Sequence, residues 1–430
     1  MDKQIQELYK VFLEFPQICT DSRKVVEDSI FFALKGPNFN GNKYAEQALS
    51  QGAAYAVIDE ERYSNNQKII LVQNVLSTLQ SLSKYHRTQI NIPVIGITGS
   101  NGKTTSKDLI SSVLSKKYQV LATSGNFNNH IGVPLTILKI NDRHDIAIIE
   151  MGTNGPGEIE FLCQLAQPDI GLITSIGKAH LEGLGDINGV VVEKTALYRS
   201  VADRDGQIIY NADSIFLKDH LPSNTHNIAF AKNGSLTLEM ILHASFPSIR
   251  GICKRGEREV ALNAKMYGEY NVSNIVSALT IGELFDVGIE DSVHAINDYD
   301  PDNNRSETRQ FRGATIYLDA YNANPSSVAL VLEQFSRSDG QKILILGDML
   351  EVGAQKDLEH KNILSAVDKQ RFEQVILLGA LYGKHKEEFK SFKFFSDFDS
   401  LQEYFDSLDI GRKEILLKGS RGMGLERLIT

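Results

Sequence analysis

The sequence predicts an α/β protein of three domains, with mostly parallel sheets in the second and third. From residue 93 onward, short apolar runs alternate with segments of helical spacing, which is the pattern of parallel strands covered by helices on both faces. A chain of 430 residues has room for two to four domains at roughly 100–200 residues each, and its 42% hydrophobic content is ordinary for a globular protein. The pattern changes at residues 224–266, where shorter alternating runs predict an antiparallel flap on the central domain.

The three domains are predicted at residues 1–88, 89–300 and 301–430. The first is a small α/β domain with strand-like runs at residues 29–34 and 54–58. In the central domain the predicted strands are residues 93–98, 119–122, 145–150, 170–174 and 207–210. The third domain is predicted to be Rossmann-like, with strands at residues 315–319, 342–347, 374–379 and 414–418.

Composition excludes several classes of function. A net charge of −9 argues against a general nucleic-acid surface, which needs a basic stripe. The three cysteines (Cys19, Cys163 and Cys253) are odd in number and widely spaced, so they predict neither a disulfide framework nor a zinc site. No apolar run approaches the ~18 residues that a membrane helix needs. We therefore expect a cytoplasmic protein, a monomer with no nucleic-acid or membrane partner.

A glycine-rich turn ending in Gly-Lys-Thr lies between the predicted strand at residues 93–98 and a helical pattern. In this setting the backbone N–H groups of the turn and the N-terminus of the helix hold phosphate groups. Lys103 would reach the β- and γ-phosphates, and the Thr104 hydroxyl would ligate Mg²⁺. The turn departs from the general P-loop pattern, because its first glycine, Gly99, stands closer to Gly102 than that pattern has it. The predicted ATP-binding residues of the loop are Gly99, Ser100, Asn101, Gly102, Lys103, Thr104 and Thr105.

Polar side chains follow the other central strands, at the edge where open parallel sheets bind ligands. They are Asn126, Asn128, Asn129, Glu150 and His180, with Lys194 on the next predicted helix. Each alone is more often a solvated or hydrogen-bonded residue, but their recurrence after consecutive strands favours a site. Mg²⁺ prefers oxygen ligands, so Thr104, one carboxylate and the phosphates of ATP would suffice for one ion. His180 and Lys194 require a further explanation.

Several strings resemble the Mur ligases, the ATP-dependent amide-forming enzymes of peptidoglycan precursor synthesis. They are residues 98–105, 123–134, 177–183 and 268–274, in order along the chain. Within the family, residues 319–325 and 418–421 resemble the branch that adds D-alanyl-D-alanine to UDP-N-acetylmuramoyl-tripeptide. The Tyr-Ala-His and Asn-Pro-Arg strings of the branch that adds the third amino acid are absent from the sequence.

The N-terminal strings at residues 20–23 and 31–36 resemble the uridine-nucleotide-binding domain of both branches. One departure stands out: Asn40-Gly41-Asn42 occupies the place of a usual Asp-Gly-His string. The resemblance implies that Ser22 and Arg23 bind the uridine nucleotide. The other implied substrate-binding residues, near the peptide stem or the incoming dipeptide, are Asn126, Asn128, Asn129, Asn322, Asn324, Ser420 and Arg421.

The resemblance also implies a mechanism. ATP phosphorylates a substrate carboxylate, and the amine of the dipeptide attacks the resulting acyl phosphate. Lys103, His180 and Lys194 become the implied catalytic residues, acting with two Mg²⁺ ions. Thr104 and Glu150 would hold the first ion, and His180 with a carbamylated Lys194 the second. Asn274, Arg305 and Asp319 match positions that contact ATP.

Other functions stay open at this point. Within enzymes, the alternatives are another Mur-family ligase, such as the third-residue-adding enzyme, or a folylpolyglutamate-synthase-like ligase. The N-terminal uridine-type domain argues against the latter. From another class, the P-loop could belong to a nucleotide-dependent switch or assembly protein. A ligase should release phosphate strongly only when both acceptor and amine are present.

Overall fold

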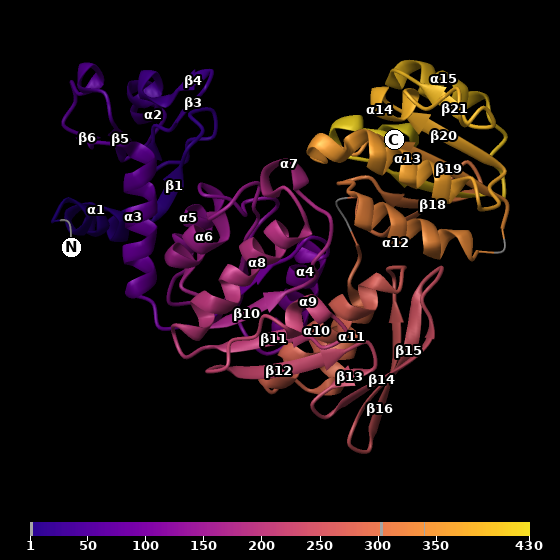
Figure 1. The fold of residues 1–430 in the computed structure, drawn as a ribbon. Coiled ribbons are helices and arrows are strands. Elements are labelled where there is room, and N and C mark those ends of the chain that lie inside the picture. Colours follow the sequence, from indigo (N-terminus) through magenta and orange to yellow (C-terminus); the bar gives the residue numbers. More distant parts are fainter. Residues whose placement is uncertain (1–2, 302–303, 339) are drawn as a thin grey trace.

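A computed structural model describes residues 3–301, 304–338 and 340–430 of the chain. It has one main sheet in each of three regions, and the N-terminal and C-terminal regions lie on opposite sides of the central one (Figure 1). The α/β class and three-domain organisation predicted from the sequence are confirmed. Within the described residues, no helix is both long enough and apolar enough to span a bilayer.

The N-terminal sheet is parallel, with strand order β1-β2-β5-β6. The predicted runs at residues 29–34 and 54–58 form β2 and β5, and β2 is completely buried because helices cover both of its faces. The elements of this region are α1 (Lys3–Glu14), β1 (Gln17–Cys19), β2 (Ser29–Phe32), β3 (Lys35–Gly36), β4 (Phe39–Asn40), η1 (Gly41–Tyr44), α2 (Ala45–Ser50), β5 (Tyr55–Ile58), η2 (Glu61–Tyr63), β6 (Ile69–Leu71) and α3 (Val75–Thr88).

The central sheet has ten strands in the order β16-β15-β14-β13-β12-β11-β10-β7-β9-β8. Helices α4, α10 and α11 cover one face, and α5, α6 and α8 cover the other. The strands are β7 (Val94–Thr98), β8 (Val120–Ala122), β9 (Ile146–Glu150), β10 (Ile170–Ile173), β11 (Gln207–Asn211), β12 (His226–Ala231), β13 (Gly234–Ser235), β14 (Leu238–Ala244), β15 (Ile249–Arg255) and β16 (Arg258–Ala264). The helices are α4 (Lys103–Leu114), α5 (Gly132–Ile137), α6 (Glu158–Ala166), α7 (Leu181–Leu184), α8 (Ile187–Ala202), α9 (Ile215–Lys218), α10 (Tyr270–Leu284) and α11 (Ile289–Asp298).

The antiparallel part of this sheet differs in extent from the prediction. It was expected from residue 224, but β12 pairs in parallel with β11, and antiparallel pairing begins only at β13. β12 is only partly buried, unlike the parallel strands in the centre of the sheet, so its sequence pattern does not reveal its direction. Strands β13 to β16 continue the central sheet by edge pairing (Figure 1).

The C-terminal sheet has the order β17-β18-β22-β19-β20-β21, in which only β17 is antiparallel to its neighbour. It is mostly parallel as predicted, although this order is not the 3-2-1-4-5-6 order of dinucleotide-binding sheets. The strands are β17 (Glu307–Phe311), β18 (Ala314–Asp319), β19 (Lys342–Gly347), β20 (Gln374–Leu378), β21 (Lys393–Phe395) and β22 (Glu414–Lys418). The helices are α12 (Pro325–Ser336), η3 (Gly353–Gln355), α13 (Lys356–Val367), α14 (Ala380–Gly383), α15 (Phe398–Ser407), η4 (Arg421–Met423) and η5 (Leu425–Ile429).

Candidate active site

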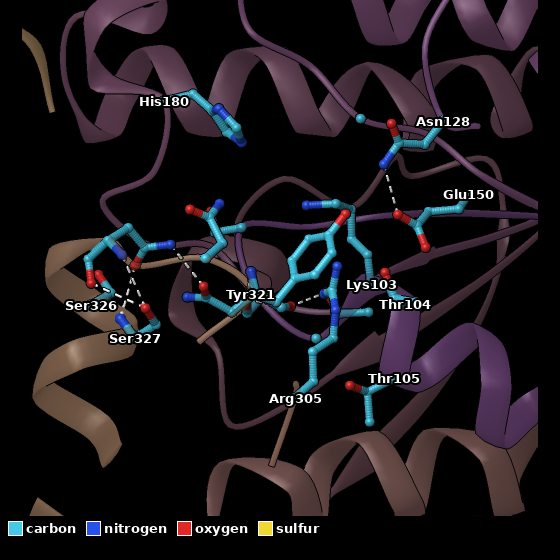
Figure 2. A pocket seen from close by; sticks show the side chains of 18 of the residues that line it. Lys103, Thr104, Thr105, Asn128, Glu150, His180, Arg305, Tyr321, Ser326 and Ser327 are labelled. Atoms are coloured by element: carbon cyan, nitrogen blue, oxygen red, sulfur yellow. Dashed lines mark hydrogen bonds between the residues drawn. The ribbon is translucent and has the colours of Figure 1, made fainter. Parts of the chain in front are cut away.

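A cavity of about 630 Å³ lies between the central and C-terminal regions (Figure 2). Its walls come from loops that follow the carboxyl ends of strands in both sheets, as expected for parallel α/β folds. Sixteen of the predicted site residues line it: Ser100, Asn101, Gly102, Lys103, Thr104, Thr105, Asn126, Asn128, Asn129, Glu150, His180, Asn274, Arg305, Asp319, Asn322 and Asn324. The predicted residues that do not line it are Ser22, Arg23, Gly99, Lys194, Ser420 and Arg421.

The glycine-rich turn connects β7 to α4 through two positions that favour glycine. Gly99 has φ +154°, and a Cβ there would lie 1.9 Å from the Thr174 hydroxyl oxygen. Gly102 has φ +82° and would bring a Cβ within 2.6 Å of Asn274 Oδ1. Helix α4 therefore begins at Lys103 with its N-terminal N–H groups beside the cavity, which is the arrangement that binds anions.

Lys103 is held inside its own loop, because its Nζ donates a hydrogen bond to the carbonyl oxygen of Gly99 at 2.7 Å. Burial lowers the pKa of the Lys103 amine, and the positive charge of Arg305 lowers it further. The negative charge of Glu150 acts in the opposite direction and raises this pKa. A phosphate ligand would supply the negative charge that this lysine lacks.

Ser100 and Asn101 brace the turn against other segments. The Ser100 hydroxyl donates to the Gly177 carbonyl at 3.0 Å and accepts from the Gly177 N–H at 2.9 Å. Asn101 Oδ1 accepts from Asn324 Nδ2 at 2.8 Å, which joins the central region to the C-terminal one. Asn324 is also the N-cap of α12, in a capping box with Ser327. These side chains hold the loop in shape as well as lining the cavity.

Glu150 ends β9 as a carboxylate that is only 1% exposed. Its Oε1 accepts from Asn128 Nδ2 at 2.8 Å, whereas Oε2 has no hydrogen-bond partner among the described residues. Burying a carboxylate oxygen without a hydrogen-bond partner is unfavourable in free energy, so this position fits a cation or a cation-bound water. Thr104 lines the same cavity (Figure 2). Among the described residues, no three His, Cys, Asp or Glu side chains are grouped closely enough to hold a metal ion, so a cation here would also need oxygen atoms from a bound ligand.

His180 and Lys194 have different surroundings. His180 Nδ1 lies 3.0 Å from Glu351 Oε2, across the boundary between the two regions. Lys194, on α8, is completely buried, and its Nζ has no hydrogen-bond partner in the described structure. Burial holds the pKa of the Lys194 amine well below its ordinary value, and the charge of Lys103 acts in the same direction. A neutral buried amine is the form that can react with CO₂, so the lysine fits the carbamate implied by the family resemblance.

The C-terminal region contributes charged side chains of both signs to the cavity wall. Asp319 Oδ2 pairs with Lys418 Nζ at 3.0 Å, and the same amine donates to the carbonyl of Asn322 at 2.5 Å. The Arg305 guanidinium lies over the Tyr321 ring. Sequence reasoning assigned no role to Tyr321, Lys418 or Glu351. The first two lie inside strings quoted for the family resemblance, whereas no signal in the sequence marked Glu351.

The remaining predicted residues lie elsewhere. Ser420 is buried and its hydroxyl accepts from the Leu350 N–H at 2.9 Å, so it braces the loop that carries Glu351. Ser22 is buried in the N-terminal region, and Arg23 is exposed and pairs with Asp21 at 2.8 Å. None of the residues that line the cavity comes from the N-terminal region.

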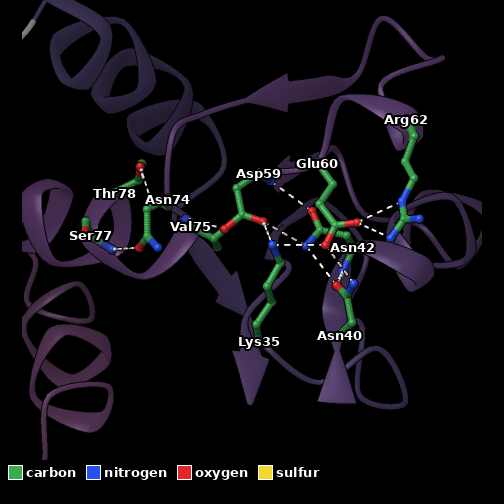
Figure 3. Close-up of polar contacts among 10 residues, drawn as sticks. All are labelled: Lys35, Asn40, Asn42, Asp59, Glu60, Arg62, Asn74, Val75, Ser77 and Thr78. Atoms are coloured by element: carbon green, nitrogen blue, oxygen red, sulfur yellow. Dashed lines mark hydrogen bonds and ion pairs between the residues drawn. The ribbon is translucent and has the colours of Figure 1, made fainter. Parts of the chain in front are cut away.

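The unusual Asn40-Gly41-Asn42 string has a structural role in the N-terminal region (Figure 3). Asn42 Nδ2 donates to Asp59 Oδ1 at 2.9 Å, and Asn42 Oδ1 accepts from the Asp59 N–H at 2.9 Å. Asn40 Nδ2 donates to Glu60 Oε1 at 2.8 Å, and Lys35 pairs with both acids. These contacts tie the β3–β4 hairpin to the end of β5.

Comparisons with known proteins agree with this architecture. The family models described as "Mur ligase family, catalytic domain", "Mur ligase middle domain" and "Mur ligase, glutamate ligase domain" match residues 14–95, 97–282 and 304–421. The chain is 34% identical to the UDP-N-acetylmuramoyl-tripeptide–D-alanyl-D-alanine ligase of Bacillus subtilis, over 99% of this chain and 97% of that one.

Solved structures match over similar lengths. A MurF from Acinetobacter baumannii is 26% identical with a TM-score of 0.87, covering 99% of this chain and 97% of that one. The MurF ligase of Thermotoga maritima, solved in complex with ADP, has the same fold with a TM-score of 0.84 at 23% identity, covering 100% of this chain and 97% of that one. The resemblance drawn from the sequence strings is thus confirmed across the whole length, and the chain belongs to the Mur ligase family of ATP-dependent acid–amino-acid ligases.

Proposed function

We propose that the chain joins D-alanyl-D-alanine to UDP-N-acetylmuramoyl-tripeptide, with ATP converted to ADP and phosphate. The observation that carries the proposal is the similarity to ligases of that name over almost the full length, which includes both walls of the cavity. A cavity built by two domains suits a reaction that must bring a nucleotide and two further reactants together.

The chemistry requires negative charges to approach one another. A substrate carboxylate attacks the γ-phosphorus of ATP to give an acyl phosphate and ADP, and the dipeptide amine then displaces phosphate through a tetrahedral intermediate. Charge spreads over phosphoryl and acyl oxygens in both steps, so catalysis rests on positioning and electrostatic stabilisation. Lys103, Arg305 and the N-terminus of α4 supply positive potential on the cavity wall.

Mg²⁺, when bound, would neutralise phosphate and carboxylate oxygens that otherwise repel each other. Thr104 and Glu150 would hold one ion, since Glu150 Oε2 is buried without a partner. His180 and a carbamylated Lys194 would hold a second ion. The Lys194 amine is buried and has no hydrogen-bond partner in the part of the chain that the structure describes, whereas His180 is paired with Glu351 and would exchange that partner. Asn274 and Asp319 belong to the nucleotide side of the proposed site.

The N-terminal region is the proposed uridine-nucleotide site, through Ser22 and Arg23. Asn126, Asn128 and Asn129, together with Asn322, Asn324, Ser420 and Arg421, would lie near the peptide stem or the dipeptide. We also propose that the protein works as a monomer in the cytoplasm. The proposed domain boundaries remain those at residues 88 and 300.

Mass spectrometry of the products tests the activity. The protein is incubated with ATP, Mg²⁺, D-alanyl-D-alanine and UDP-N-acetylmuramoyl-tripeptides that end in lysine or diaminopimelate. A pentapeptide product with phosphate release that needs both acceptor and amine supports the proposal. Parallel incubations offer a dipeptide acceptor with single amino acids, or a folate with glutamate, and product formed only in one of these would favour the corresponding alternative ligase. Phosphate release that depends on neither reactant would favour a nucleotide-dependent switch.

A further inference from the structure

Two arginines from distant parts of the sequence lie over one tyrosine ring. The guanidinium carbon of Arg305 is 3.7 Å from the centroid of the Tyr321 ring, and that of Arg421 is 5.3 Å from it. Arg305 precedes β17, Tyr321 follows β18, and Arg421 begins η4 after β22. Three connections of the C-terminal domain therefore meet at this ring, which lines the cavity (Figure 2).

The ring offers these arginines an electrostatic attraction. The π face of an aromatic ring is negative and attracts a cation within about 6 Å of its centroid. Arg305 Nε is buried and has no hydrogen-bond partner among the described residues. Two guanidinium groups near each other repel, and the ring they share offsets part of that repulsion.

The charge of Arg305 also reaches the nucleotide loop. Its positive charge is among those that act on the Lys103 side chain of that loop. Arg305, Lys103 and Tyr321 all line the cavity. Displacement of Arg305 would therefore change the potential at the place where anionic reactants must sit.

We propose that Tyr321 is a positioning residue for the ligase reaction, whose ring, with Arg421 lying over it as well, holds the guanidinium group of Arg305 in place for the anionic oxygens of the reactants. The inference rests on the proposed function, and it gives Tyr321 a role through its ring face. A role for its hydroxyl as a hydrogen-bond donor to a reactant is the contrasting explanation.

Three variants separate these explanations. Tyr321→Phe keeps the ring, Tyr321→Leu removes the π face at similar bulk, and Phe398→Leu is the matched control. The guanidinium carbon of Arg427 lies 3.9 Å from the centroid of the Phe398 ring, but Phe398 does not line the cavity. kcat and KM for ATP are measured with the full chain, and the affinity for a non-hydrolysable ATP analogue is measured by calorimetry.

We expect the kcat/KM of Tyr321→Phe and of Phe398→Leu to stay within about twofold of the parent value. The kcat/KM of Tyr321→Leu should fall about tenfold, a loss in the range that cation–π contacts supply. The melting temperature should move no more for Tyr321→Leu than for Phe398→Leu. Should Tyr321→Leu fail to fold, Tyr321→Met replaces it as the non-aromatic variant. Equal losses for Phe and Leu would assign the role to the hydroxyl and overturn the proposal, as would full activity of Tyr321→Leu.

A double-variant cycle tests whether Tyr321 acts through the arginines. In an Arg305→Gln background the effect of Tyr321→Leu should shrink to less than about twofold, because the group that the ring positions is gone. Additive losses would overturn the proposal. If the parent lacked ligase activity, the proposed function would fail, while the calorimetric comparison of Tyr321→Phe with Tyr321→Leu would still decide the role of the ring.

Discussion

Lys178 Nζ lies 2.6 Å from Glu359 Oε1 and joins the loop after β10 to helix α13 of the C-terminal domain. The Glu359 side chain is 6% exposed and that of Lys178 is 48% exposed. The Lys178 N–H also donates to Ser326 Oγ at 2.9 Å, and His180 follows two residues later with its own partner, Glu351. One short loop of the central domain thus makes three polar contacts with the C-terminal domain.

Lys178→Met should loosen this loop and reduce turnover. The variant leaves Glu359 largely buried without its cation, and we expect a loss of about 1 kcal/mol in stability, since the exposed lysine end is screened by water. We expect kcat to fall roughly tenfold, equivalent to ~1.4 kcal/mol in the barrier. Lys384→Met is the control. Lys384 pairs at 2.7 Å with Asp357, which lies on α13 as Glu359 does, but both side chains of this pair are about half exposed. Equal effects of the two variants in steady-state kinetics would contradict a special role for Lys178.

The parts of the fold that depend on local pattern could be predicted from the sequence. Buried strands consist of continuous apolar runs, so β7 and β9 in the central sheet and β22 in the C-terminal sheet lie where they were expected. β21 was not predicted because it has only three residues and is partly exposed. The direction of β12 was missed because this strand is only partly buried and lacks the complete burial that marks the parallel strands in the centre of the sheet.

Contacts between distant segments could not be predicted. Lys178 and Glu359 are 181 residues apart, and nothing in their local patterns indicates a pair. The burial of Lys194 could not be predicted either. The sequence around it favours an exposed lysine on a helix, but α8 is packed on several sides and buries this side chain. Only the resemblance to a family indicated a functional role for this residue.

Lys103→Ala should abolish ATP-dependent turnover while the fold is retained. Its amine is the positive charge of the phosphate loop, and its only hydrogen bond in the described structure is to Gly99 within that loop. We expect a loss of at least about 100-fold in kcat/KM, the scale of removing a preorganised charge from a transition state. Lys116→Ala, just after α4, is the control because its one ion pair, to Asp298, is long at 3.8 Å. An unchanged turnover rate of Lys103→Ala would contradict the assignment of the loop.

Glu150→Gln should raise the concentration of Mg²⁺ needed for half-maximal activity by about tenfold or more, because a carboxylate ligand of a hard cation becomes a neutral amide. The amide can still accept from Asn128 through its oxygen, so the local packing is kept. The melting temperature should be unchanged or higher, because the variant removes a buried charge whose Oε2 has no hydrogen-bond partner among the described residues. An unaltered Mg²⁺ requirement in titrations of activity would exclude Glu150 as a ligand.

His86 should make the stability depend on pH. Its Nε2 donates to the Ile140 carbonyl at 2.8 Å and Nδ1 accepts from the Tyr9 hydroxyl at 3.1 Å, so the neutral ring is the form that fits. Burial lowers the pKa of His86, and the bond to Ile140 opposes this. The unfolded chain therefore binds the proton more readily, and the stabilisation is complete above about pH 6.5 and decreases as the pH falls below it.

The measurement is the difference in melting temperature between about pH 7.5 and about pH 5.5, on either side of the ordinary histidine pKa. His86→Gln should show a smaller difference than the parent, because the titrating group is gone. His226→Gln, at an exposed position of β12, should match the parent. A His86→Gln protein with the full pH dependence of the parent would place the titration elsewhere, with the buried His360 the next group to test.

Lys194→Ala distinguishes a carbamylated ligand from a structural lysine. A carbamate would place negative oxygen atoms where the chain now has a buried amine without a partner, and its loss would remove a ligand of the second Mg²⁺ while ATP still binds through Lys103 and Thr104. Formate or acetate could enter the space left by the side chain and restore part of the ligand set. We therefore expect a large loss of turnover, partial rescue by these ions and no rescue by chloride at the same ionic strength.

Lys218→Ala is the control, because this exposed lysine at the end of α9 should change stability by no more than about 0.5 kcal/mol and leave turnover unchanged. ATP affinity measured by calorimetry should be similar in the Lys194→Ala protein and the parent, so that the loss lies in the chemical step. Near-normal turnover of Lys194→Ala would rule out the carbamate. Lost turnover that neither formate nor acetate restores would count against a carbamate, because the vacated space should admit the small carboxylate that replaces it.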